Sequence, residues 1–157
     1  MRQLDKSQIE DALRLYDIGR RLRASLRYNL DEVDWSQREF TVLTNREGNE
    51  GVLLSDVTRV GVIAYRLKKR RAGVSGRTES IICDICMTWQ AGSRSATITF
   101  EKARGSSSFL VCADLACCDH VRNKTLDALI SRGQLREHIS VEARIDRLQR
   151  NLERILT

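Results

Sequence analysis

The chain has 157 residues, which is enough for one domain or a domain and a half. Its 27 lysine and arginine residues outnumber 21 acidic residues, and the net charge of +6 favours an anionic partner, either nucleic acid or an acidic protein surface. No apolar run approaches the ~18 residues of a membrane helix and the first residues lack an apolar signal segment, so we expect a cytoplasmic protein with no membrane partner.

The first half of the chain is predicted to contain one helix and a small antiparallel sheet. A capping box formed by Ser7 and Glu10 begins a helix that we expect to run over about residues 8–26 with a wide apolar face. Residues 31–35 are predicted to form a turn. Strand-like segments follow at residues 39–44, 51–54 and 58–67, with turns at 45–50 and at Asp56.

A basic run separates the two halves. It contains no acidic residue and includes two glycines, Gly73 and Gly76; its basic residues are Arg66, Lys68, Lys69, Arg70, Arg71 and Arg77. We interpret the run as a linker or an exposed loop and place a domain boundary near residue 72. This divides the chain into an N-terminal helix and β region (1–72) and a zinc-binding domain (73–157). A solvated loop and a true contact surface explain the run equally well.

Two cysteine pairs are the strongest chemical signal in the chain. Cys83 and Cys86 form a C-x2-C pair, and Cys112 and Cys117 form a C-x4-C pair after 25 intervening residues. Two close pairs of thiols can converge on one tetrahedral zinc ion. Four thiolates then occupy all four coordination positions of the ion. Disulfides, a thioredoxin-like redox pair and buried inert cysteines are the alternatives. The pattern predicts one structural zinc ion, whose binding free energy would support a chain with only 5% aromatic residues.

The elements expected around these cysteines describe a treble-clef zinc finger. A hairpin knuckle holds residues 83–86, and strands follow at 96–102 and 109–112, separated by a flexible segment at 105–108. A helix is expected from about Asp114 to residue 132, with Cys117 in its first turn. Ser140 is expected to cap a last helix with a buried apolar stripe, formed by Val141, Ile145, Leu148, Leu152 and Ile155. The whole chain is therefore predicted to be α+β.

Cys118 and His120 are ambiguous next to this site. Adjacent residues of a helix point about 100 degrees apart, so only one of Cys117 and Cys118 can face the ion, and we assign Cys117. His120 lies one turn further on and is interpreted as a neighbour of the site rather than a ligand.

The second half resembles the treble-clef domain of elongation factor G-binding proteins, the group that includes the fusidic acid resistance proteins. The resemblance covers about residues 80–153 and is carried by C-D-I-C-M-T at 83–88, V-C-A-D-L-A-C at 111–117, V-R-N-K at 121–124 and the segment at 137–152. It implies a zinc domain that binds elongation factor G and, in the resistance proteins, helps this factor leave a ribosome stalled by fusidic acid. Arg122 and Lys124 match basic positions of the family and are candidate partner-binding residues. Alternatively, both side chains only solvate the helix and partly neutralise the negative charge of the zinc–thiolate centre.

Three classes of function remain to be compared. A module that binds elongation factor G is the main hypothesis, with the ribosome as a possible further partner. A nucleic-acid-binding zinc protein that reads ribosomal RNA or DNA is the alternative, because the charge and the basic run suit it. An enzyme is not expected, since the chain has two histidines, no H-E-x-x-H motif, no P-loop and no dinucleotide fingerprint, and we expect no small-molecule substrate.

Overall fold

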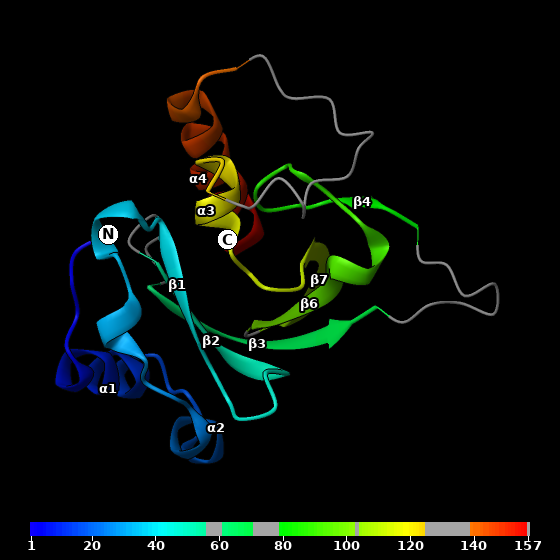
Figure 1. Ribbon diagram of the computed structural model, residues 1–157. Coiled ribbons are helices and arrows are strands. Elements are labelled where there is room, and N and C mark those ends of the chain that lie inside the picture. The colour runs from blue at the N-terminus through cyan, green and yellow to red at the C-terminus, as the bar shows by residue number, and fades with distance from the viewer. Residues whose placement is uncertain (56–60, 71–78, 103, 125–138, 157) are drawn as a thin grey trace.

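The computed structural model describes residues 1–55, 61–70, 79–102, 104–124 and 139–156 (Figure 1). Its centre is a five-stranded sheet in the order β1-β2-β3-β6-β7, in which every neighbouring pair is antiparallel. These strands are β1 (Phe40–Thr44), β2 (Glu50–Ser55), β3 (Val62–Lys69), β6 (Ser95–Lys102) and β7 (Gly105–Cys112). A second, two-stranded sheet pairs β4 (Ile81–Ile82) with β5 (Trp89–Gln90). The predicted α+β class is confirmed.

Helices lie before, between and after the strands. The α-helices are α1 (Lys6–Leu15), α2 (Arg20–Ser25), α3 (Cys117–Val121) and α4 (Val141–Leu156), and the 3-10 turns are η1 (Leu30–Glu32), η2 (Trp35–Gln37) and η3 (Gly92–Arg94). No helix within the described ranges is long and apolar enough to cross a membrane.

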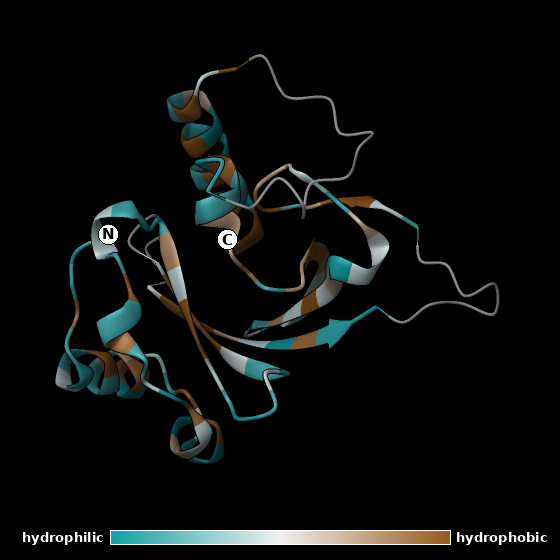
Figure 2. Cartoon of the chain, viewed as in Figure 1, coloured by the Kyte–Doolittle hydropathy of each residue, from teal (hydrophilic) through white to brown (hydrophobic). Residues whose placement is uncertain are grey.

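The sheet carries a hydrophobic core on each face. Along β2 the side chains alternate, so that Val52 and Leu54 belong to one core and Leu53 belongs to the other. The first core is closed by α1, which contributes Ile9 and Leu13, and by α2, from which the partly buried Leu22 packs against it. The second core is larger and is closed by α3, α4 and the cysteine knuckle. Figure 1 shows the two groups of helices on either side of the sheet, and Figure 2 shows hydrophobic residues interspersed along the strands.

The single N-terminal helix predicted over residues 8–26 is wrong, because the chain breaks it between α1 and α2. Asp17 adopts a left-handed backbone (φ 51°), which aspartate tolerates better than most residues, and Gly19 is the N-cap residue of α2. The capping residue is also different from the expected Ser7: the amide of Gln8 donates to the Asp5 carboxylate at 2.8 Å, and the Asp5 amide donates to the Gln8 side chain. The break lets both short helices pack on one core.

The expected flexible segment at 105–108 is also wrong, since these residues form the first half of β7. The hairpin register pairs Lys102 with Gly105 and Thr99 with Ser108, whose hydroxyls are 2.7 Å apart. Backbone pairing with β6 therefore decides the structure of a segment whose residues have little strand propensity of their own.

Gly51 is required by the packing of the sheet. It lies opposite Tyr65 in the β2–β3 register, and the Tyr65 ring is almost completely buried above it. A Cβ atom at Gly51 would lie 2.2 Å from the carbonyl oxygen of Leu43 and 2.8 Å from the Tyr65 hydroxyl. Any other residue here would force the backbone or the ring to move.

The last helix follows its prediction closely. Ser140 caps α4 by accepting a hydrogen bond from the amide of Ala143 at 3.2 Å. The C-terminal part of the predicted stripe is fully buried, with Leu148, Leu152 and Ile155 at 0% exposure in the larger core. The stripe is thus an intramolecular core contact.

The two predicted domains share one sheet and one core. The pairing of β3 with β6 crosses the boundary expected near residue 72, and the larger core combines Phe40 and Leu53 with Leu148. Residue 72 lies outside the described ranges, as do the basic run beyond Arg70, the turn at Asp56 and the start of the third predicted strand. The helix expected from about Asp114 to residue 132 is wrong within the described residues, because α3 begins at Cys117 and ends at Val121, and Leu115 (φ 53°) and Asn123 (φ 55°) on either side of it are left-handed; its part beyond residue 124 lies outside the described ranges. The division at residue 72 stays a prediction.

Candidate metal centre

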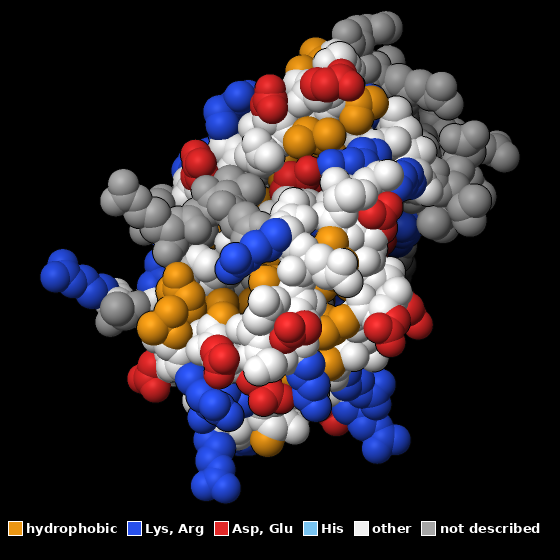
Figure 3. Space-filling view, turned by 90° about the vertical axis from the view of Figure 1, so that its left-hand side faces the viewer, with side chains coloured by type: hydrophobic (Ala, Val, Ile, Leu, Met, Phe, Trp, Pro, Cys, Tyr) orange, Lys and Arg blue, Asp and Glu red, His pale blue; other side chains and the backbone are white. Residues whose placement is uncertain are grey.

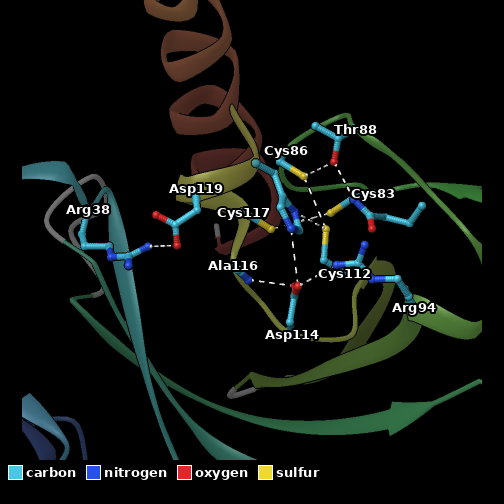
Figure 4. Close-up of polar contacts among 12 residues, drawn as sticks. Arg38, Cys83, Cys86, Thr88, Arg94, Cys112, Asp114, Ala116, Cys117 and Asp119 are labelled. Carbon is cyan, nitrogen blue, oxygen red and sulfur yellow. Dashed lines mark hydrogen bonds and ion pairs between the residues drawn. The ribbon is translucent and has the colours of Figure 1, made fainter. Parts of the chain in front are cut away.

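Three elements bring the four predicted cysteines together. Cys83 and Cys86 lie in the tight turn between β4 and β5, where the Met87 amide donates to the Cys83 carbonyl at 2.8 Å and Met87 is left-handed (φ 57°). Cys112 is the last residue of β7 and Cys117 is the first residue of α3. A second left-handed residue, Leu115 (φ 53°), reverses the chain between them. Figure 4 shows the four thiols facing one another.

The sulfur atoms have the spacing that a zinc ion requires. All four lie within 4.8 Å of one another, with 3.8 Å between the Cys83 and Cys117 sulfurs and 3.6 Å between those of Cys86 and Cys112. A tetrahedral ion with Zn–S bonds of about 2.3 Å separates its ligands by about 3.8 Å. All four residues are completely buried. The cluster therefore fits a closed four-thiolate site with no coordination position left for a substrate.

The electrostatics of the thiols also call for a cation. Hydrogen bonding to the Cys112 sulfur, together with the other two thiols and burial, raises the pKa of Cys117 well above its ordinary value. Burial raises the pKa of Cys86 too, but hydrogen bonds from the neighbouring thiols outweigh this and leave its pKa low. Buried thiols this close cannot all ionise alone, and a divalent ion removes that obstacle.

A polar chain supports the cluster from outside. The Nδ1 atom of His120 is 3.2 Å from the Cys112 sulfur, and its Nε2 atom is 3.4 Å from the Asp114 carboxylate. Asp114 also accepts hydrogen bonds from the amide of Ala116 and the guanidinium of Arg94. Burial opposes a charge on His120, but the hydrogen bonds to Asp114 and to Cys86 raise its pKa to about 9. Such outer contacts orient the ligand that they touch.

Cys112, Asp114 and His120 also lie close enough to one another to form a second possible group of metal ligands. This group shares the sulfur of Cys112 with the four-cysteine cluster, and Asp114 is exposed to solvent. We therefore interpret Asp114 and His120 as support for the thiolate. Sequence reasoning placed His120 beside the site but gave no role to Asp114, Arg94 or Thr88, whose hydroxyl is 2.9 Å from the Cys86 sulfur.

Cys118 lies outside the cluster. Its thiol donates a long hydrogen bond of 3.7 Å to the carbonyl oxygen of Phe40 in β1. The helix thus directs Cys117 to the other thiols and Cys118 to the sheet, which is the arrangement that the helical geometry predicts.

The two candidate partner-binding residues lie in different environments. The Arg122 guanidinium donates hydrogen bonds to both carboxylate oxygens of Glu39 and a further one, of 2.9 Å, to the carbonyl oxygen of Cys118. Its side chain is only 13% exposed. Lys124 is exposed. A second ion pair of 2.8 Å joins Arg38 to Asp119 of the same helix (Figure 4). Arg122 and Asp119 therefore tie α3 to residues 38 and 39, which immediately precede β1.

Comparison with known proteins covers nearly the whole chain. The family model of the FBP C-terminal treble-clef zinc-finger matches residues 8–157, which includes the N-terminal helices and β1–β3 as well as the cysteines. A search of curated proteins and a search of solved structures found no match. The family and the buried four-cysteine cluster together establish one structural zinc ion as the cofactor. The chain belongs to the FBP C-terminal treble-clef zinc-finger family.

Proposed function

We propose that this protein is a zinc-stabilised module that binds elongation factor G in the cytoplasm and modulates its release from the ribosome, with tolerance to fusidic acid as a possible consequence for the cell. The observation that carries the proposal is the family match over residues 8–157. The resemblance of residues 80–153 to elongation factor G-binding proteins, described above, names the partner. The net charge of +6 suits an acidic protein face.

Cys83, Cys86, Cys112 and Cys117 are the proposed zinc ligands. When bound, the ion cross-links the knuckle, the end of β7 and the start of α3. All four of its positions are then taken by thiolates, so the ion holds a surface in shape and offers no open position to a substrate. This arrangement supports a binding function rather than a catalytic one.

Lys124 is the stronger of the two candidate contact residues, because its side chain is exposed. The guanidinium of Arg122 is already engaged by Glu39, and a partner would have to compete with that carboxylate. We therefore expect Lys124→Glu to weaken the association with elongation factor G. Arg122 would act through the position of α3.

The test is a direct binding measurement between the zinc-loaded full chain and purified elongation factor G over a range of salt concentrations, with ribosomal RNA as a second ligand. A packed protein interface predicts an affinity that survives moderate salt. Binding to single-stranded RNA predicts that log affinity falls linearly with log salt, with a slope of about −0.7 for each phosphate contacted. Release of the factor from ribosomes stalled by fusidic acid is measured in parallel.

Tight RNA binding with a steep salt dependence, and no detectable binding to elongation factor G, would replace the proposal with the nucleic-acid alternative. Binding to the factor that is unchanged after zinc removal and unfolding of the finger would also contradict it, since the proposed surface depends on the zinc.

A further inference from the structure

A basic pocket lies between the two N-terminal helices, on the opposite face of the sheet from the zinc cluster. Its volume is about 410 Å³, within the range of small-ligand sites. Four of the side chains that line it are cationic and one is a carboxylate; these are Lys6, Arg14, Arg20, Arg23 and Glu10. The ring of Tyr28 forms part of the wall.

Two of these cations, Arg20 and Arg23, have no acidic partner among the residues that the structure describes. Lys6 pairs with Glu10 at 3.9 Å, and Arg14 pairs with Asp11 at 3.6 Å on an exposed surface. Among the described residues, the side chains of Arg20 and Arg23 form neither an ion pair nor a hydrogen bond, and the Nε atom of Arg23 is buried without a partner. Unpaired buried donors are costly and uncommon in folded proteins.

The sequence of α2 accounts for this excess of charge. The helix has the sequence R-R-L-R-A-S, with no acidic residue and no side-chain cap at its start. Arg20 and Arg23 are three residues apart, so both side chains lie on one face of the helix, which here is the face toward the pocket. Like charges at this spacing repel each other, and an anion between them would reverse that effect.

From this geometry we infer that the pocket between α1 and α2 binds a phosphate group through Arg20 and Arg23. The planar guanidinium matches the oxygen atoms of phosphate with two parallel hydrogen bonds. Tyr28 can add a neutral donor, because burial, followed by the nearby charge of Glu10, raises its pKa and keeps the phenol protonated. This site is separate from the proposed contact with elongation factor G and does not depend on it.

The phosphate can be a free anion or a link in an RNA backbone. Arg21 and Arg27 are exposed and adjoin pocket residues in the chain, which adds positive charge to this part of the sequence. Figure 3 shows several Lys and Arg side chains toward the lower end of the molecule, with acidic side chains among them, at the height of α1 and α2 in Figure 1. The same site is therefore tested with both sources of phosphate.

The experiment consists of two titrations of the zinc-loaded full chain. Inorganic phosphate is added while amide chemical shifts are recorded, and a labelled single-stranded RNA of roughly 12 nucleotides is added while fluorescence anisotropy is recorded. The pocket variant is Arg20→Gln/Arg23→Gln. The matched control is Arg46→Gln/Arg104→Gln, which removes the same charge from exposed positions outside the pocket. Retained zinc and unchanged helical signal show that both variants are folded.

We expect the pocket variant to bind phosphate or RNA about tenfold more weakly or worse, since charge-assisted hydrogen bonds are lost, while the control changes the affinity less than twofold. An RNA source also predicts a salt slope that is shallower by about 0.7 in the pocket variant alone. Equal losses in both variants would show diffuse attraction to net charge and would overturn the site. So would the absence of saturable binding to either probe, or binding that shifts no amide of α1 or α2.

Discussion

Replacing Arg122 by alanine should destabilise the fold strongly, although the residue is a candidate for partner binding. Arg122 and Glu39 are 13% and 7% exposed, and the guanidinium contacts both oxygens of the carboxylate. Truncation leaves this carboxylate buried and unpaired, and it also leaves the carbonyl oxygen of Cys118 without that donor. Breaking a buried ion pair on one side costs about 3–5 kcal/mol, and we expect Arg122→Ala to fall in this range.

The cost of Arg122→Ala should depend on pH. Burial alone raises the pKa of Glu39, but the hydrogen bonds from Arg122 outweigh burial and hold the pKa below its ordinary value. A group whose pKa is lowered by folding stabilises the protein above its unfolded pKa, here about 4.3, and the stabilisation is lost as the pH falls through the folded value. In the variant, burial without Arg122 raises the pKa of Glu39. The difference between wild type and variant should therefore be largest well above the unfolded pKa and should shrink as the pH falls from the raised pKa of the variant to the lowered pKa of the wild type.

The assay is urea unfolding at saturating zinc, with Lys124→Ala as the matched control. Lys124 is exposed two residues further along the chain, and its truncation should change the free energy of unfolding by no more than about 0.5 kcal/mol. Arg122→Lys should lower the free energy of unfolding less than Arg122→Ala, because lysine keeps the positive charge although it cannot donate the two parallel hydrogen bonds of a guanidinium. If Arg122→Ala costs no more than Lys124→Ala at pH 7, the ion pair does not hold α3 to the sheet, and the argument for a structural role fails.

Three further predictions concern the core and the metal. Leu148→Ala removes three carbons from a fully buried site. The lost transfer free energy, about 0.8 kcal/mol per carbon, and the cost of the cavity should together lower the free energy of unfolding by about 2–5 kcal/mol in denaturant unfolding. A loss smaller than about 1 kcal/mol would show that the site is not packed as described. Cys117→Ser should lose zinc in elemental analysis while Cys118→Ser keeps it, and the reverse result would reassign the ligand. Gly51→Ala should lower the melting temperature, at a cost on the order of 1–3 kcal/mol, because its Cβ would meet the Leu43 carbonyl at 2.2 Å; a wild-type melting curve would refute that clash.

Local patterns predicted the elements that local chemistry decides. The cysteine spacing brought four thiols to one place, since a C-x2-C pair needs only a tight turn and the second pair needs only a strand end followed by a helix. The cap at Ser140 and the stripe through Leu148 likewise depend on residues within one helix. These features need no information from distant parts of the chain.

Features that depend on distant partners were not predicted. The break after Leu15 follows from the packing of Ile18 and Leu26 on the sheet, whereas their spacing alone suits a continuous helix. The first half of β7 is a strand because β6 lies beside it. Asp114 was visible in the C-A-D-L-A-C segment, but its role depends on His120 turning toward it from α3. Pairing partners of this kind lie outside any sequence window.

The zinc cluster and the sheet are parts of one structural unit. The four cysteines belong to the same core as Phe40 and Leu53 from the first half of the chain, and α3 is joined to the residues immediately before β1 by the Arg38–Asp119 and Arg122–Glu39 ion pairs. Because zinc holds α3 in place and α3 holds β1, the binding free energy of the ion also stabilises the N-terminal half.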